Sequence, residues 1–215
     1  PSLLDGRCRC GEETDATGDR PMEESVKALV AAMRENPWDA RHYTVHGDWI
    51  PCETMRMMAE SGIAHNTQTA IKYVLADDTT RRAGEERSGN QWPLRELLDM
   101  GIRVCNSSDT PVVDSDWRVG LQTAITREAK GSGNVSGAHQ AITVEEGIRS
   151  YTIVPAWLDH AEDIKGSIEP GKLADFCIIG KDITAIDPHA IMDTPVLMTI
   201  MDGRVVYSDD SLNIQ

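Results

Sequence analysis

The feature that most constrains the fold is an alternation of short β-prone runs with amphipathic helical segments along residues 1–160. Apolar residues at helical spacing predict helices between the runs. The predicted helices cover residues 19–36, 51–62, 93–100, 116–128 and 143–159. The predicted strands end near Asp15, His46, Gln68 and Asp109. Because repeated β-α units build a parallel sheet with helices outside it, we expect an α/β fold.

The pattern changes near the end of the chain, where helical periodicity gives way to β-prone runs. Residues 166–171 are rich in turn formers, and Asp202-Gly203 between two apolar runs is a strong hairpin signal. We therefore divide the chain into β-α units at residues 1–162 and a β-rich part at residues 163–215. Residues 77–90 are charged and contain glycine, which favours an exposed loop.

Composition excludes several classes of partner. The net charge is −14, which argues against nucleic acid or an anionic membrane surface as a partner, because both need basic protein surface. No run approaches the roughly 20 apolar residues of a membrane span, and no charged-then-apolar leader is visible. Five cysteines, with a bare C-x-C at Cys8 and Cys10, indicate reduced thiols rather than a zinc site. We expect a cytoplasmic protein.

Asp109 and His46 are the first candidate site residues, because each follows a predicted strand. The carboxyl ends of parallel strands are where reactive side chains collect in α/β folds. An imidazole and a carboxylate from two such ends can bind one divalent metal. The alternatives are that Asp109 caps a turn and that His46 is a satisfied structural histidine. Gln68 ends another strand and is a candidate for facing the site, whereas His42 is interpreted as structural.

Several short motifs occur in a fixed order and carry a resemblance. They are Gly18-Asp19-Arg20, Arg41-His42 with His46, Trp92-Pro93-Leu94-Arg95, Ser108-Asp109-Thr110-Pro111-Val112, Gly147-Ile148-Arg149-Ser150-Tyr151-Thr152, Ile168-Glu169-Pro170-Gly171-Lys172-Leu173-Ala174-Asp175 and the hairpin residues Val196, Thr199, Gly203, Val205, Val206 and Tyr207. Together they resemble the C-terminal half of metal-dependent amidohydrolases. Within that superfamily, the chain is similar to the branch of N-substituted formamide deformylases and D-aminoacylase relatives.

The resemblance implies a (β/α)8 barrel with a β-sandwich side domain, of which this chain would form the C-terminal half of the barrel and part of the sandwich. It implies a divalent metal, usually zinc, and hydrolysis of a non-peptide carbon–nitrogen bond in a small amide or N-acyl substrate. His46 would match a metal ligand. Asp109 would match the last-strand aspartate that binds metal and takes the proton of the attacking water.

Three departures from the family pattern bear on activity. The family places a histidine where this chain has Asp15, which would then be a carboxylate metal ligand. The family glutamate before the second histidine is Val45 here. The H-x-H pair of the family's first barrel strand has no counterpart in this sequence.

Half a barrel leaves open sheet edges and an apolar interior, so we expect the chain to associate with itself or with a missing N-terminal half. Two hypotheses remain open: a metal-dependent hydrolase completed by another chain, and a non-catalytic fragment or remodelled domain. Arg95 is expected to pair with a surface acid and Tyr151 to pack the last helix. The remaining histidines, for which surface positions are expected, are His65, His139, His160 and His189.

Overall fold

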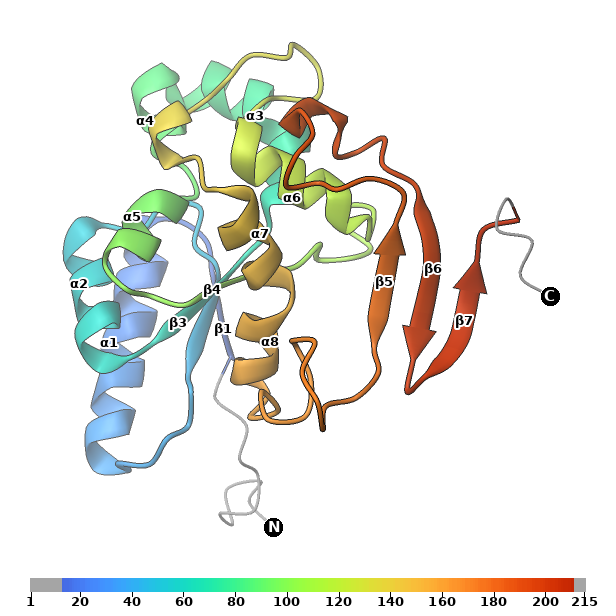
Figure 1. Ribbon diagram of the computed structural model, residues 1–215. Helices are drawn as coiled ribbons and strands as arrows, with labels where there is room; N and C mark the ends of the chain where they lie inside the picture. Colours follow the sequence, from blue (N-terminus) through green and yellow to red (C-terminus); the bar gives the residue numbers. More distant parts are fainter. Residues whose placement is uncertain (1–12, 211–215) are drawn as a thin grey trace.

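A four-stranded parallel sheet forms the centre of the computed structural model, which describes residues 13–210 (Figure 1). Its strands are β1 (Glu13–Ala16), β2 (Tyr43–His46), β3 (Ala64–Thr67) and β4 (Val104–Asn106). They lie side by side in the order β1-β2-β3-β4, and every neighbouring pair is parallel. The predicted α/β fold with a parallel sheet is therefore confirmed. The C-x-C of Cys8 and Cys10 lies outside the described residues.

Helices connect the strands and supply most of the core. In chain order they are α1 (Asp19–Glu35), α2 (Cys52–Ser61), α3 (Thr69–Ala83), α4 (Glu85–Gly89), α5 (Leu94–Asp99), α6 (Trp117–Thr126), η1 (Ala138–Gln140), α7 (Val144–Tyr151), α8 (Ile153–Leu158) and η2 (Pro188–Ala190). The apolar stripe of α1 is buried at Met22, Val26 and Leu29. Gly62 ends α2 in the left-handed conformation, as its position after the apolar stripe predicts.

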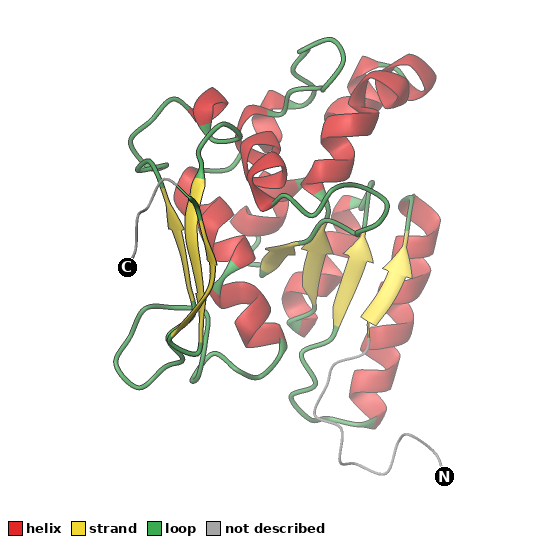
Figure 2. Cartoon of the chain, turned by 90° about the vertical axis from the view of Figure 1, so that its right-hand side faces the viewer, coloured by secondary structure: helices red, strands yellow, loops and turns green. Residues whose placement is uncertain are grey.

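The two faces of the parallel sheet are covered differently. Side chains of α1, α2 and α5 pack in one large cluster with Ile63 and Val104. On the opposite face, Leu158 of α8 packs with Ala64 and Cys105, and α8 lies between the two sheets of the molecule (Figure 2). The expectation of an exposed apolar interior is therefore wrong for this part of the sheet, because α8 folds back over it.

Two predicted boundaries are also wrong. Residues 77–90 are not a loop: α3 continues to Ala83, and α4 follows it directly. Asp78 pairs with Arg81 and Arg82 one turn away, and such pairs stabilise a polar helix that lacks a clear apolar stripe. The single helix expected to Asp159 breaks at Thr152, because Pro155 cannot donate the backbone hydrogen bond that a continuous helix needs.

The β-rich tail forms an antiparallel sheet of β5 (Phe176–Ile179), β6 (Val196–Met201) and β7 (Arg204–Ser208) in the order β5-β6-β7. Asp202 and Gly203 both have positive φ at the tip between β6 and β7, which confirms the hairpin. All five residues of β7 are exposed.

Candidate functional site

The four candidate residues of the sequence meet at one edge of the parallel sheet. Asp15 lies on β1, His46 ends β2, Gln68 follows β3 and Asp109 follows β4. Because the strands run parallel and in sequential order, their carboxyl ends form a row. The local sequences end the strands there: Gly47 follows His46, and Pro111 stops the run that leads to Asp109.

His46 stands at the centre of this group. Its Nε2 lies 3.2 Å from Asp15 Oδ1 and 4.0 Å from Asp109 Oδ2, and its Nδ1 lies 2.9 Å from Gln68 Oε1. The imidazole is only 16% exposed, whereas the carboxylates of Asp15 and Asp109 are 73% and 38% exposed. The site is therefore a half-buried histidine facing two more open carboxylates.

The hydrogen bonds of Gln68 define the orientation of the His46 ring. Gln68 Nε2 donates to Ser107 Oγ at 3.0 Å and to the carbonyl of Asn66 at 3.3 Å, which leaves Oε1 facing His46. An amide oxygen only accepts, so His46 Nδ1 carries the proton and donates it to Gln68. In the neutral imidazole, the lone pair of Nε2 then faces Asp15 and Asp109. Two carboxylates that face one imidazole nitrogen make this edge of the sheet electrostatically favourable for a cation.

The backbone at this edge adopts an uncommon conformation. His46 and Asp109 have φ of 67° and 60°, and Gly47 has φ of 54°. A Cβ at Gly47 would lie 2.5 Å from His65 Cε1, so glycine is needed there for space as well as for φ. Positive φ at non-glycine residues is infrequent and is often found at functional sites.

His65 is the residue that sequence reasoning placed wrongly. It is fully buried rather than on the surface, and its Nδ1 lies 2.9 Å from Thr44 Oγ1. Burial lowers the pKa of His65 to about 3, so the ring is neutral beneath the His46–Gly47 turn. Its position directly after the apolar residues Ile63 and Ala64, at the start of a predicted strand, was the available signal. Among the other histidines, His139 and His189 are exposed as expected.

Asp48 is a further carboxylate near the site that the sequence did not single out. Burial raises the pKa of Asp48, and the neighbouring His46 and a hydrogen bond from Gln91 act in the opposite direction. It follows His46 by two residues, so the turn after β2 places a third acid, besides Asp15 and Asp109, near the imidazole. Position after a strand end was its signal, although Gly47-Asp48 also matches an ordinary turn.

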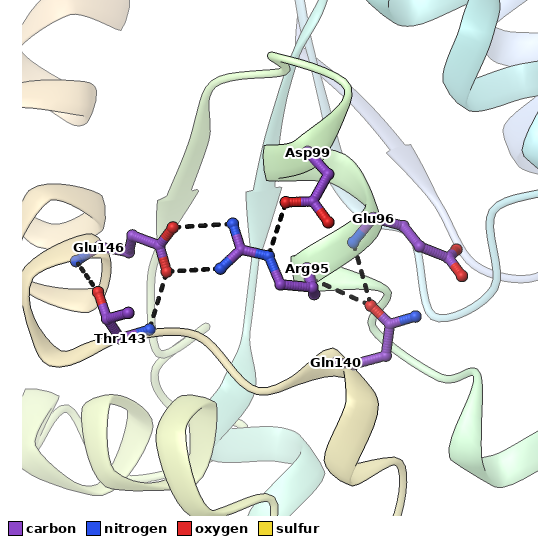
Figure 3. Close-up of polar contacts among 6 residues, drawn as sticks. All are labelled: Arg95, Glu96, Asp99, Gln140, Thr143 and Glu146. Carbon is purple, nitrogen blue, oxygen red and sulfur yellow. Dashed lines mark hydrogen bonds and ion pairs between the residues drawn. The ribbon is translucent and has the colours of Figure 1, made fainter.

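Arg95 makes structural contacts, as expected (Figure 3). Its guanidinium donates to both carboxylate oxygens of Glu146 at 2.8 Å and to Asp99 at 2.9 Å. Glu146 also completes the predicted capping box of α7 with Thr143. Tyr151 packs in the cluster of Leu121, as predicted for the last helix.

The described residues contain no group of three or more His, Cys, Asp and Glu side chains placed to hold a metal ion together. His46, Asp15 and Asp109 therefore form an open, incomplete donor set within residues 13–210. In the same range, none of the helices has the length and apolar character needed to cross a bilayer.

The chain matches its curated relatives over only part of their length. The chain is 28% identical over 198 residues to the "Putative amidohydrolase YtcJ" of Bacillus subtilis (strain 168), covering 89% of this chain and 36% of that protein. It is 32% identical over 116 residues to the N-substituted formamide deformylase of Arthrobacter pascens, covering 54% of this chain and 21% of that protein. The chain thus spans about a third or less of these curated relatives.

Solved structures with the same fold also match this chain over only part of their own length. A metal-dependent hydrolase from Pyrococcus horikoshii OT3 superposes with a TM-score of 0.68 at 19% identity, over 83% of this chain and 35% of that one. An ochratoxinase from A. niger superposes with a TM-score of 0.65 at 15% identity, over 92% of this chain and 42% of that one. The sequence model of the amidohydrolase family matches residues 13–207. The chain therefore belongs to the amidohydrolase family.

Proposed function

We propose that this chain carries the proton-accepting part of a metal-dependent hydrolase that cleaves carbon–nitrogen bonds of small amides or N-acyl compounds. The observation that carries the proposal is the meeting of three strand ends, where the His46 lone pair faces Asp15 and Asp109. Family membership and the names of its relatives support the reaction class. Asp109, whose side chain is 38% exposed, would accept the proton of the attacking water.

The donor chemistry fits a divalent metal such as zinc. Zinc takes imidazole nitrogen and carboxylate oxygen as ligands, and these are what His46, Asp15 and Asp109 would offer. When bound, the metal supplies Lewis-acid activation of water and of the scissile carbonyl. Gln68 is buried and holds the His46 tautomer, as outer partners of ligand histidines do, and a role in substrate binding is proposed for it only through His46. The donor set is incomplete within the described residues, so further ligands would come from outside them.

The proposed architecture is the C-terminal half of a (β/α)8 barrel together with part of a sandwich side domain. The four parallel strands in sequential order and the separate antiparallel sheet support it. The H-x-H pair and the covering strands would be contributed by an N-terminal amidohydrolase segment. Self-association is the other outcome for the open sheet edges.

The second candidate function is a non-catalytic domain that keeps the fold. Asp15 and Val45 replace residues that carry the site in the family pattern, and no described group of three donors exists. These observations favour the loss of catalytic activity. The hydrogen bond from His46 to Gln68, which fixes the His46 tautomer, favours a retained metal ligand.

Zinc binding by the full chain separates the two candidates. We expect calorimetry to detect one zinc per chain, and His46→Ala and Asp109→Asn each to weaken the affinity by about tenfold or more. Matched controls are His139→Ala and Asp193→Asn, which change exposed residues away from this edge. Zinc binding that is absent, or that is equally strong in all four variants, would contradict the metal-site proposal. Hydrolysis of N-formyl and N-acyl amines would then be assayed with the zinc-loaded chain.

A further inference from the structure

A cluster of buried cationic groups and hydrogen-bond donors lies outside the candidate site. It consists of Lys72 in the first turn of α3, Trp92 before α5, and Arg127 at the end of α6. The three residues are at most 2% exposed. None of them belongs to the donor set around His46, so the cluster needs its own explanation. We call it the Lys72–Arg127 cluster.

The cluster contains more hydrogen-bond donors than acceptors. Arg127 donates from Nη1 to the carbonyl of Trp92 at 3.2 Å and from Nη2 to the carbonyl of Gln91 at 2.6 Å. Lys72 Nζ lies 5.9 Å from the centre of the Trp92 ring. Lys72 Nζ, Arg127 Nε and Trp92 Nε1 are buried without a hydrogen-bond partner among the described residues. A single unpaired side-chain acceptor, Gln91 Oε1, is buried in the same segment.

The cluster also carries positive charge without a neighbouring negative charge among the described residues. Burial lowers the pKa of Lys72 to about 7, and the positive charge of Arg127 lowers it further in the same direction. Burial lowers the pKa of Arg127 to about 9, with no carboxylate acting against it. Two like charges in a dry environment are costly unless a counter-charge accompanies them. In the described part of the chain, no ion pair joins a carboxylate to either residue.

We propose that the Lys72–Arg127 cluster binds one small anion of halide size. An anion accepts from several N–H donors at once, and Lys72 Nζ, Arg127 Nε and Trp92 Nε1 each lack an acceptor within residues 13–210. Its negative charge would also offset the positive charges of Lys72 and Arg127. The enclosure of Lys72 and Arg127 by this chain favours an ion about as large as a water molecule over the carboxylate of another protein. A water molecule satisfies the donors but supplies no counter-charge.

The bound anion would stabilise the two chain segments that follow Gln68 and His46. Helix α3 begins directly after Gln68, and Lys72 lies in its first turn. The backbone N–H of Trp92 donates to the carbonyl of Asp48 at 2.8 Å, in the turn that follows His46. Occupancy of the cluster therefore stabilises the fold at that edge, and this effect does not depend on the proposed hydrolase activity.

Thermal unfolding of the full chain in halide salts tests the proposal. At pH 6, where Lys72 carries its proton, and at constant ionic strength, replacing gluconate by chloride or bromide should raise Tm by roughly 3–5 °C for each tenfold increase in halide above the dissociation constant. Lys72→Met should abolish the halide dependence, because it removes the charge while keeping an apolar side chain of similar length. Lys181→Met, at an exposed lysine, should retain it.

A crystal of the unmodified chain soaked in bromide gives an independent readout that does not need a variant to fold. The proposal expects an anomalous peak within hydrogen-bonding distance of Lys72 Nζ. A Tm that is independent of halide, a halide effect that is equal in Lys72→Met, or the absence of a bromide peak at the cluster would each overturn it.

Discussion

The two β-sheets of this molecule are built from similar residues and have opposite surroundings. All three residues of β4, Val104–Asn106, are buried, whereas all five residues of β7, Arg204–Ser208, are exposed. Val205 and Val206 remain 54% and 57% exposed although their sequence is as β-prone as that of β4. The parallel sheet is buried because the connecting helices α1, α2 and α5 cover one face and α8, which follows β4, packs on the other. The hairpin that joins β6 to β7 brings no such cover, so β7 stays exposed among the described residues.

Truncation of a core side chain in each region should give the largest contrast. Leu97→Ala in α5 should lower the free energy of unfolding by about 2–5 kcal/mol, because Leu97 is fully buried. Val206→Ala in β7 should change it by no more than about 0.5 kcal/mol. Urea denaturation of the two variants checks this. A cost at Val206 similar to that at Leu97 would mean that β7 is covered in solution and would remove the contrast.

Acid should destabilise the parallel region through His65. The folded-state pKa of about 3 lies below the ordinary value of 6.5, so between these values only the unfolded state binds the proton. Stability is therefore complete above pH 6.5 and is lost as the pH falls toward 3, by up to about 1.4 kcal/mol for each pH unit. Denaturation of His65→Gln from pH 7 to pH 4 should show a smaller slope than the parent chain. His139→Gln, at an exposed histidine, should keep the parental slope.

The contacts between α5 and α7 allow a finer test within the helical layer. Arg95→Met should cost about 1–3 kcal/mol, because it removes a bidentate pair with Glu146 that is about 70% buried. Arg56→Met, which removes the exposed i,i+3 pair with Glu53, should cost no more than about 0.5 kcal/mol. Thermal unfolding of both variants measures the difference. Equal costs would show that the Glu146 pair contributes no more than a surface pair.

The smallest effect on stability is expected from a charge on the exposed sheet. Val206→Lys should change the free energy of unfolding by less than about 0.5 kcal/mol. If the exposed sheet mediates self-association, the same substitution should shift the chain toward monomer in sedimentation velocity. An unchanged distribution of species would assign any association to the edges of the parallel sheet instead.

Sequence patterns predicted the elements whose signals are local. The stripe of Met22, Val26 and Leu29 marked α1, and Asp202-Gly203 marked the hairpin, because each depends on neighbours within a turn. The pattern failed at α3, whose polar end is stabilised by Asp78–Arg81 and Asp78–Arg82 pairs rather than by an apolar stripe. It also failed at Thr152, where one proline outweighed an otherwise continuous periodicity.

The sequence predicted which residues lie at the sheet edge but not how the rest of the molecule packs around them. Strand-end position identified His46, Gln68 and Asp109, because parallel strands align their carboxyl ends, and the family pattern pointed to Asp15. It could not show that His65 lies buried under Gly47, that α8 covers the inner face, or that Asp48 turns toward His46. These depend on contacts between elements far apart in the sequence.

The sequence by itself determined the α/β order, the family motifs and the residues at the strand ends, since these follow from periodicity and position along the chain. Only the tertiary structure decided the tautomer of His46, because Gln68 Nε2 donates to Ser107 and leaves Oε1 to accept from His46. Only the tertiary structure brought Lys72 and Arg127 together in a dry environment. The physical reason is that desolvation and hydrogen-bond pairing arise from packing, which no single stretch of sequence contains.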